Sequence, residues 1–148
     1  MSEERDQQEG RQLFCRVITP EEVIYDGEAD LVVARIADGD LGVLVDHSPL
    51  VSTVEVGEIR IREGEEQHVY ATSDGFFKVS ENLVQILVEE AVPVEEIDVD
   101  EAENRVEQAE NELSEVPEDD EETRAEIERR RDVAENLVWV AREYVEQG

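Results

Sequence analysis

Residues 92–101 read VPVEEIDVDE, and this stretch marks the point at which the pattern of the sequence changes. Before it, short apolar runs alternate with turn residues, which is typical of strands. After it, apolar residues recur every three or four positions, which is typical of amphipathic helices. Asp98 and Glu101 form the Asp-x-x-Glu pattern of a helix N-terminus, where the first side chain caps free backbone N–H groups. The sequence therefore predicts a β region followed by an α-helical region.

The candidate strands before Pro93 are short and are separated by turn signals such as Asp26-Gly27 and Asp74-Gly75. They cover residues 13–19, 22–25, 31–36, 41–45, 58–62, 67–72, 76–80 and 83–88. Short strands at spacings of about 8 to 12 residues favour an antiparallel sandwich or barrel. We predict an N-terminal antiparallel β-sandwich domain over residues 13–94, preceded by a flexible polar tail over residues 1–12.

Two amphipathic stripes follow the junction. The first is formed by Ala102, Val106, Ala109 and Leu113, and its helix should end before Pro117, since proline cannot continue the backbone hydrogen bonding. Asp119 or Asp120 could cap a second helix, whose stripe consists of Ile127, Ala134, Leu137 or Val138, Ala141 and Val145. Two such helices joined by a short connector predict a C-terminal antiparallel two-helix hairpin over residues 95–148.

The first stripe is thin, because it consists of two alanines, one valine and one leucine. Trp139 and Tyr144 thicken the second stripe, although Trp139 lies off its centre. At about 25 cal/mol per Å² of buried apolar area, docking of such a hairpin gains only about a few kcal/mol. We therefore expect a helical pair that can detach and rearrange.

The 148 residues include 42 acidic and 13 basic side chains, which gives a formal net charge of −29. Such a charge repels phosphate groups, so we expect no nucleic-acid partner and no direct lipid insertion. The single cysteine, Cys15, excludes an intrachain disulfide and a cysteine-cluster metal site. The polar start of the chain is not typical of a signal peptide, and the sequence contains no apolar run of about 18 residues. We expect a protein of the reducing cytoplasm.

The basic residues are almost all arginine, since Lys78 is the only lysine. High acidity with little lysine suits a protein that works in concentrated salt, where screening removes the self-repulsion. A GC-rich genome that favours arginine codons would give the same bias, and the two explanations stay open. A gain in stability in molar salt would support the first.

No arrangement of residues indicates catalysis. Cys15 lies inside an apolar strand, where it is more typical of a buried side chain than of a nucleophile. His47 and His68 are the only histidines and lie in different segments, so we expect no metal site. An enzyme with a two-histidine metal site is the alternative, and its divalent metal binding would be lost on changing His47 or His68.

One charge cluster stands out in the second predicted helix: Arg124, Arg129, Arg130 and Arg131 lie within eight residues. Intrahelical pairing, for example of Arg131 with Glu135 or of Arg130 with Glu126, would explain the cluster at a few tenths of a kcal/mol for each pair. In the functional interpretation these arginines bind an acidic patch on a partner. The chain could then be a stand-alone adaptor for an acidic protein.

Three segments carry long, ordered motifs: residues 39–51 (GDLGVLVDHSPLV), 57–61 (GEIRI) and 74–87 (DGFFKVSENLVQIL). Together with Ile97-Asp98 and the alanine-containing helix after it, they resemble the epsilon subunits of bacterial F-type ATP synthases. The resemblance extends from about residue 12 to 146. The chain departs from the family pattern at Val45, where proline is usual, and at Asp74, where glycine is usual.

The resemblance implies a non-catalytic subunit of the central stalk of a proton-translocating ATP synthase. Its sandwich would bind the gamma subunit and the c ring, and would couple rotor rotation to ATP synthesis. In many bacterial members the two helices can extend along gamma towards the alpha and beta subunits and block ATP hydrolysis. The loop carrying Asp40 and His47 would face the c ring, or His47 would simply pack that loop. The implied location is peripheral, on the cytoplasmic face of the cell membrane.

Some members of that family bind ATP on the folded hairpin through Ile/Leu-Asp-x-x-Arg-Ala and further arginines. Ile97, Asp98 and Ala102 match this pattern, but Glu101 stands in place of the arginine and Gln108 follows seven residues later. A carboxylate at Glu101 would repel a polyphosphate. We therefore expect no nucleotide or other cofactor.

Overall fold

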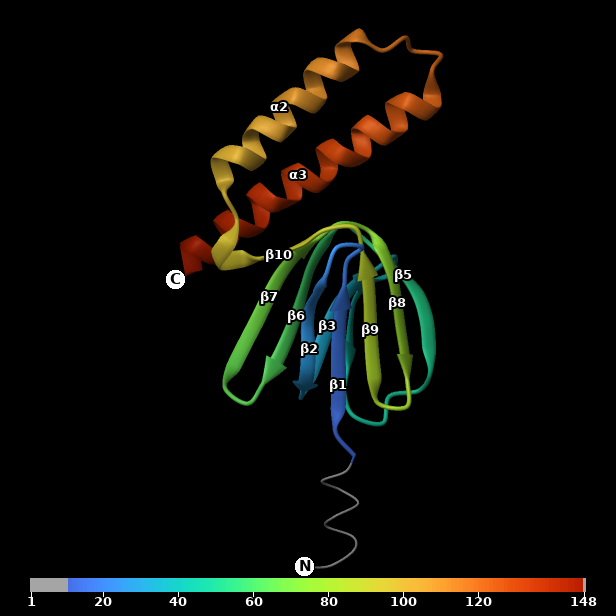
Figure 1. The fold of residues 1–148 in the computed structure, drawn as a ribbon, viewed down its shortest axis with the longest axis vertical. Coiled ribbons are helices and arrows are strands. Elements are labelled where there is room, and N and C mark those ends of the chain that lie inside the picture. The colour runs from blue at the N-terminus through green and yellow to red at the C-terminus, as the bar shows by residue number, and fades with distance from the viewer. Residues whose placement is uncertain (1–10, 148) are drawn as a thin grey trace, which may run out of the picture. The chain divides into compact units, whose positions relative to one another are not determined.

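The computed structural model describes residues 11–147, with side chains described up to Tyr144. The chain divides into two compact units, one up to Ala91 and one from Val92 onward. The first unit is built of strands and the second contains the helices (Figure 1). The predicted tail over residues 1–12 lies almost entirely outside the described residues.

The strands of the first unit are short, and most alternate buried and more exposed residues, as a strand with one face on a core requires. In chain order the strands of the described chain are β1 (Leu13–Ile18), β2 (Val23–Ala29), β3 (Leu31–Ile36), β4 (Gly39–Val43), β5 (Leu50–Val54), β6 (Gly57–Glu63), β7 (Glu66–Thr72), β8 (Gly75–Ser80), β9 (Leu83–Val88) and β10 (Ala91–Pro93), which begins at the last residue of the first unit.

The strands form two five-stranded sheets. Sheet A has the order β2-β1-β9-β8-β5 and sheet B the order β10-β7-β6-β3-β4, and the two face each other (Figure 1). The predicted β-sandwich is confirmed. One pair, β1 with β9, is parallel, with Phe14 beside Leu83. The sequence analysis did not anticipate this pair, nor strands β5 and β10.

The core of the sandwich consists of the inward-facing residues of both sheets. Its largest fully buried side chains include Leu13, Val17, Ile59, Ile61, Phe77 and Ile86. Burial raises the pKa of the Cys15 thiol to about 12, so Cys15 stays neutral and acts as a small apolar side chain. Gly75, part of one motif quoted above, begins β8, where a Cβ atom would lie 2.1 Å from the carbonyl oxygen of Leu87. Any side chain at Gly75 would push β8 and β9 apart.

The second unit contains a short 3₁₀ turn, η1 (Val94–Glu96), followed by α2 (Val99–Glu115) and α3 (Glu121–Gln147). The Asp98 carboxylate accepts a hydrogen bond from the Glu101 N–H at 3.1 Å and caps α2 as predicted. At the start of α3, Asp120 accepts a hydrogen bond from the Thr123 N–H at 3.3 Å. The two helices lie side by side as a hairpin, so this prediction is confirmed as well (Figure 1).

The buried faces of the two helices are unequal. On α2 only Ala102 and Ala109 are buried, while Val106 and Leu113 of the predicted stripe are half-buried. Among the described side chains of α3, the buried ones are Ile127, Val133, Ala134, Leu137, Val140 and Ala141. Leu137 rather than Val138 therefore belongs to the buried stripe, and the side chain of Val145 lies outside the described residues.

Candidate functional site

The outer face of sheet A carries several large, exposed apolar side chains. Phe76 on β8 is 63% exposed and Val51 on β5 is 71% exposed. Phe14 and Leu87 are also exposed, and Leu87 lies directly opposite Phe76 on the neighbouring strand. Exposed apolar residues on adjacent strands of one face indicate a protein interaction surface.

A polar row crosses this apolar face. Cross-strand pairing aligns Asp26, Arg16, Gln85 and Lys78 from β2 to β8, and the apolar Val51 of β5 ends the row. Arg16 pairs with Asp26 at 3.4 Å, whereas Lys78, the only lysine, makes no ion pair within the described part of the chain. A partner that covers this face would therefore meet an apolar surface with a cation at its centre, in a protein that is otherwise strongly acidic.

The loop between β4 and β5 is hydrogen-bonded to the turn between β8 and β9. The Asp46 N–H donates to Asn82 Oδ1 at 2.6 Å, and Asn82 Nδ2 donates to Asp46 Oδ1 at 3.2 Å. Both residues have positive φ, 66° and 63°, which Asn and Asp tolerate better than most residues. Arg11 forms an ion pair with Asp46. This loop is consequently fixed by side chains 36 positions apart in the sequence.

The tip of the same loop is apolar, because Leu44 is 57% exposed and Val45 is exposed beside it. His47 follows, half-buried, and its Nδ1–H donates to the Ser48 carbonyl oxygen at 2.7 Å. Asp40 does not share this loop, which corrects the sequence analysis. It lies near the start of β4 and accepts a hydrogen bond from Arg35 Nε at 3.4 Å, so strand β4 separates it from His47.

The arginine cluster is largely engaged within the hairpin. Arg124 donates to the carbonyl oxygens of Leu113 and Val116, both at 3.1 Å, and so satisfies the C-terminal end of α2. Arg130 pairs across the hairpin with Glu112 at 3.3 Å, not with Glu126 on its own helix. Arg131 pairs with Glu135 at 3.7 Å, as expected for i,i+4 neighbours. These contacts weaken the case for an adaptor that binds through these arginines.

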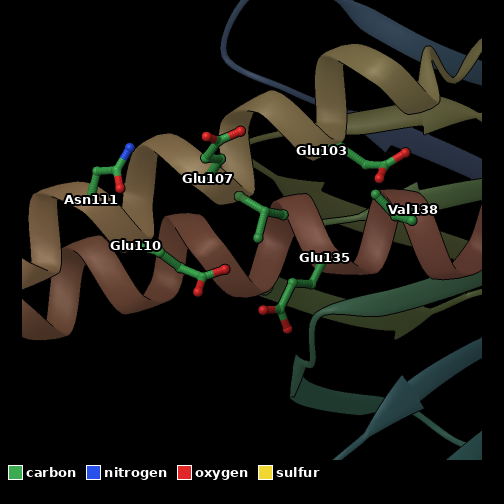
Figure 2. Close-up of a pocket in the computed structure, with 7 residues that line it drawn as sticks. Glu103, Glu107, Glu110, Asn111, Glu135 and Val138 are labelled. Atoms are coloured by element: carbon green, nitrogen blue, oxygen red, sulfur yellow. The ribbon is translucent and has the colours of Figure 1, made fainter.

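A groove of about 420 Å³ lies between α2 and α3 (Figure 2). It is lined by Glu103, Val106, Glu107, Glu110, Asn111, Glu135 and Val138. Four of these seven residues are carboxylates, so the groove repels a polyphosphate. Ile97, Asp98 and Ala102, the residues that match a nucleotide-binding pattern, include the cap of α2 and a buried alanine. The geometry gives no support for nucleotide binding on the hairpin.

Among residues 11–147, the one group of three metal-capable side chains comprises Glu63, Glu66 and His68, and His47 is not a member. The sequence analysis missed this group, although its turn at Gly64 places Glu63 opposite Glu66. No helix in the described part of the chain is long and apolar enough to cross a membrane.

Comparison with known proteins gives consistent matches. The family model described as "ATP synthase, Delta/Epsilon chain, beta-sandwich domain" matches residues 12–94. The ATP synthase epsilon chain of Rubrobacter xylanophilus is 66% identical over 140 residues, covering 92% of this chain and 96% of that protein. The sodium-ion-specific epsilon chain of Propionigenium modestum is 38% identical over 91 residues, covering 62% and 66%.

Among solved structures, a chain in the Euglena gracilis mitochondrial ATP synthase, determined with OSCP, F1 and the c ring, matches with a TM-score of 0.69. It is 28% identical, and the match covers 86% of this chain and 79% of that one. The sandwich, the two helices and these relatives agree, and the chain belongs to the family of ATP synthase epsilon chains.

Proposed function

We propose that this chain is a non-catalytic central-stalk subunit of an F-type ATP synthase. Its sandwich binds the gamma subunit, and so transmits ion-driven rotation of the rotor to ATP synthesis in the catalytic head. The observation that carries this proposal is the outer face of sheet A, with its exposed Phe14, Val51, Phe76 and Leu87. Exposure of this apolar area to water is unfavourable in free energy, so the face is suited to being covered by a permanent partner subunit.

The loop between β4 and β5 is the proposed contact with the c ring. Its tip, Leu44 and Val45, is apolar, and the hydrogen bonds between Asp46 and Asn82 fix the conformation of the loop in the unbound chain. A preformed loop loses little conformational freedom on binding. The protein then lies at the cytoplasmic face of the cell membrane as a peripheral component of the complex, without entering the lipid.

The hairpin is the proposed inhibitor of ATP hydrolysis. Because α2 buries only two alanines, little apolar contact opposes its release. Released helices present Arg129, Arg130 and Arg131, with the 60% exposed Trp139, to the alpha and beta subunits. A few kcal/mol then suffice to shift the hairpin between its two arrangements.

The test is ATP hydrolysis by the cognate catalytic head containing gamma, titrated with the full chain and with a truncation ending at Val94. We expect both to bind gamma and only the full chain to inhibit. If both bind and neither inhibits, the hairpin is not an inhibitor. If neither binds gamma, the family role fails and the adaptor interpretation replaces it.

Two matched variants separate the proposed interfaces. Phe76→Glu places a charge on the outer face of sheet A and should abolish gamma binding. Leu44→Glu, at the loop tip, should leave gamma binding unchanged and weaken binding to a complex that contains the c ring. If Leu44→Glu instead abolished gamma binding and Phe76→Glu weakened only c-ring binding, the loop tip would be the gamma contact and the outer face of sheet A the c-ring contact.

A further inference from the structure

A group of metal-ligand side chains lies at the tip of the hairpin formed by β6 and β7. Glu63, Glu66 and His68 each offer one ligand atom, and these atoms all lie within 4.8 Å of one another. His68 Nε2 is 3.6 Å from a carboxylate oxygen of Glu66. One of only two histidines in the chain thus lies close to two carboxylates, which distinguishes this group from purely acidic pairs on the surface.

The backbone at this tip holds the two carboxylates in register. Glu63 and Glu66 are direct cross-strand partners, joined by the turn Gly64-Glu65. Gly64 has φ +61°, which glycine adopts without strain, and its N–H donates to Asp30 Oδ2 at 2.6 Å. The Asp30 N–H in turn donates to the Arg62 carbonyl oxygen at 2.7 Å. The turn is therefore anchored to the chain segment between β2 and β3.

The imidazole is also held in place. His68 lies two residues after Glu66 on β7, so both side chains project from the same face of the strand. The ring of Tyr25 packs on the His68 ring at a centroid distance of 5.3 Å and an angle of 54°. The Tyr25 hydroxyl is itself fixed, since it donates to the Glu28 carbonyl oxygen at 2.8 Å.

The charges at the tip are not compensated by the protein. Like charges directly opposite each other in a sheet are destabilising, and no arginine or lysine in the described part of the chain pairs with Glu63 or Glu66. A bound cation would relieve this repulsion.

The chemistry of the three ligand side chains indicates which cation would bind. Imidazole with two carboxylates suits first-row divalent transition metals such as Zn²⁺, whose ligands lie at about 2.0–2.2 Å. Ligand atoms around a tetrahedral Zn²⁺ are then separated by about 3.3–3.6 Å, so the exposed glutamates need to move by only about 1 Å. We propose that Glu63, Glu66 and His68 bind a divalent transition-metal ion at the tip of this hairpin, with its remaining coordination positions open to water.

The test is calorimetric titration of the full chain with Zn²⁺, in excess Mg²⁺ to saturate non-specific binding to a chain of this charge. His68→Gln and Glu66→Gln should each weaken Zn²⁺ binding at least about tenfold. His47→Gln changes the other histidine and should leave the affinity unchanged. Circular dichroism of each variant checks that the fold is intact, which is expected because the ligands lie at an exposed hairpin tip.

Substitution with Co²⁺ supplies a second, spectroscopic measurement. The visible absorption of bound Co²⁺ should change with His68→Gln and stay unchanged with His47→Gln. Zn²⁺ binding that survives His68→Gln, or that is lost with His47→Gln, would overturn the proposal. So would the absence of any Zn²⁺ binding beyond what excess Mg²⁺ displaces.

Discussion

The two units of this chain are stabilised in different ways. In the sandwich, two sheets bury large side chains such as Phe77, Ile59 and Ile86 completely. In the hairpin, α2 buries only Ala102 and Ala109, and polar contacts from Arg124 and Asp98 secure the ends of the helix. The chain thus joins a sandwich with a fully buried core of large side chains to a hairpin in which α2 buries little apolar area.

The largest expected effect is on the sandwich core. Phe77→Ala should lower the free energy of unfolding by about 3–5 kcal/mol, because it removes a fully buried aromatic side chain and leaves a cavity. Urea unfolding of the full chain measures this change. Trp139→Ala, at an exposed position of α3, is the control and should cost much less. Similar losses for both variants would contradict the proposed division of stability.

The next effect concerns the hairpin. Arg124→Ala removes two hydrogen bonds to the end of α2, and should destabilise that helix by about 1–2 kcal/mol. Hydrogen exchange should accelerate in α2 and stay unchanged in the sandwich strands. Arg142→Ala removes only an exposed ion pair with Glu103 and should have a smaller effect. Faster exchange throughout the sandwich would show that the two units are not independent.

Asp98→Ala tests the other end of α2. Loss of the N-cap should cost about 1 kcal/mol and should increase inhibition of ATP hydrolysis if the released hairpin is the inhibitor. Asp98→Asn keeps the cap and should behave like the unchanged chain. Asp100→Ala, in the first turn of α2, supplies a charge-matched control. Equal inhibition by the unchanged chain and all three variants would show that inhibition does not depend on the stability of α2.

The smallest expected effect is a loss of folding stability at alkaline pH, and it concerns the sandwich alone. The pKa of Cys15 is raised from 9.0 to about 12 in the folded chain, so the stability it contributes is present below pH 9 and is lost as pH rises towards 12. At pH 9.5 the loss relative to pH 7 should be under about 1 kcal/mol. Cys15→Val should remove this part of the pH dependence, measured by urea unfolding. An unchanged slope would show that other groups cause it.

Much of this architecture follows from local sequence pattern. The change at residues 92–101, the cap at Asp98 and the stop before Pro117 set the limits of the helices, and each depends on neighbouring residues only. Strand β5 was missed because Pro49 made its surroundings resemble a loop. The parallel pairing of β1 with β9 joins residues far apart in sequence, and strand periodicity does not encode the order of strands.

The candidate functional surfaces could be predicted less well from the sequence than the fold. The role of Arg124 depends on carbonyl groups of another helix, so the charge pattern around it suggested partner binding instead. The approach of His68 to Glu63 and Glu66 requires the register of a hairpin and the packing of Tyr25 from another sheet. The outer face of sheet A becomes visible only when exposed residues on β1, β5, β8 and β9 are placed side by side.

The position of Lys78 has a practical consequence. It is the only lysine in the sequence, and it lies on the outer face of sheet A between Val51 and Gln85. An amine-reactive fluorophore or cross-linker therefore has a single side-chain target, at the centre of the surface proposed to meet gamma. Protection of this one amine in an assembled complex would map the interface by mass spectrometry, without any substitution in the chain.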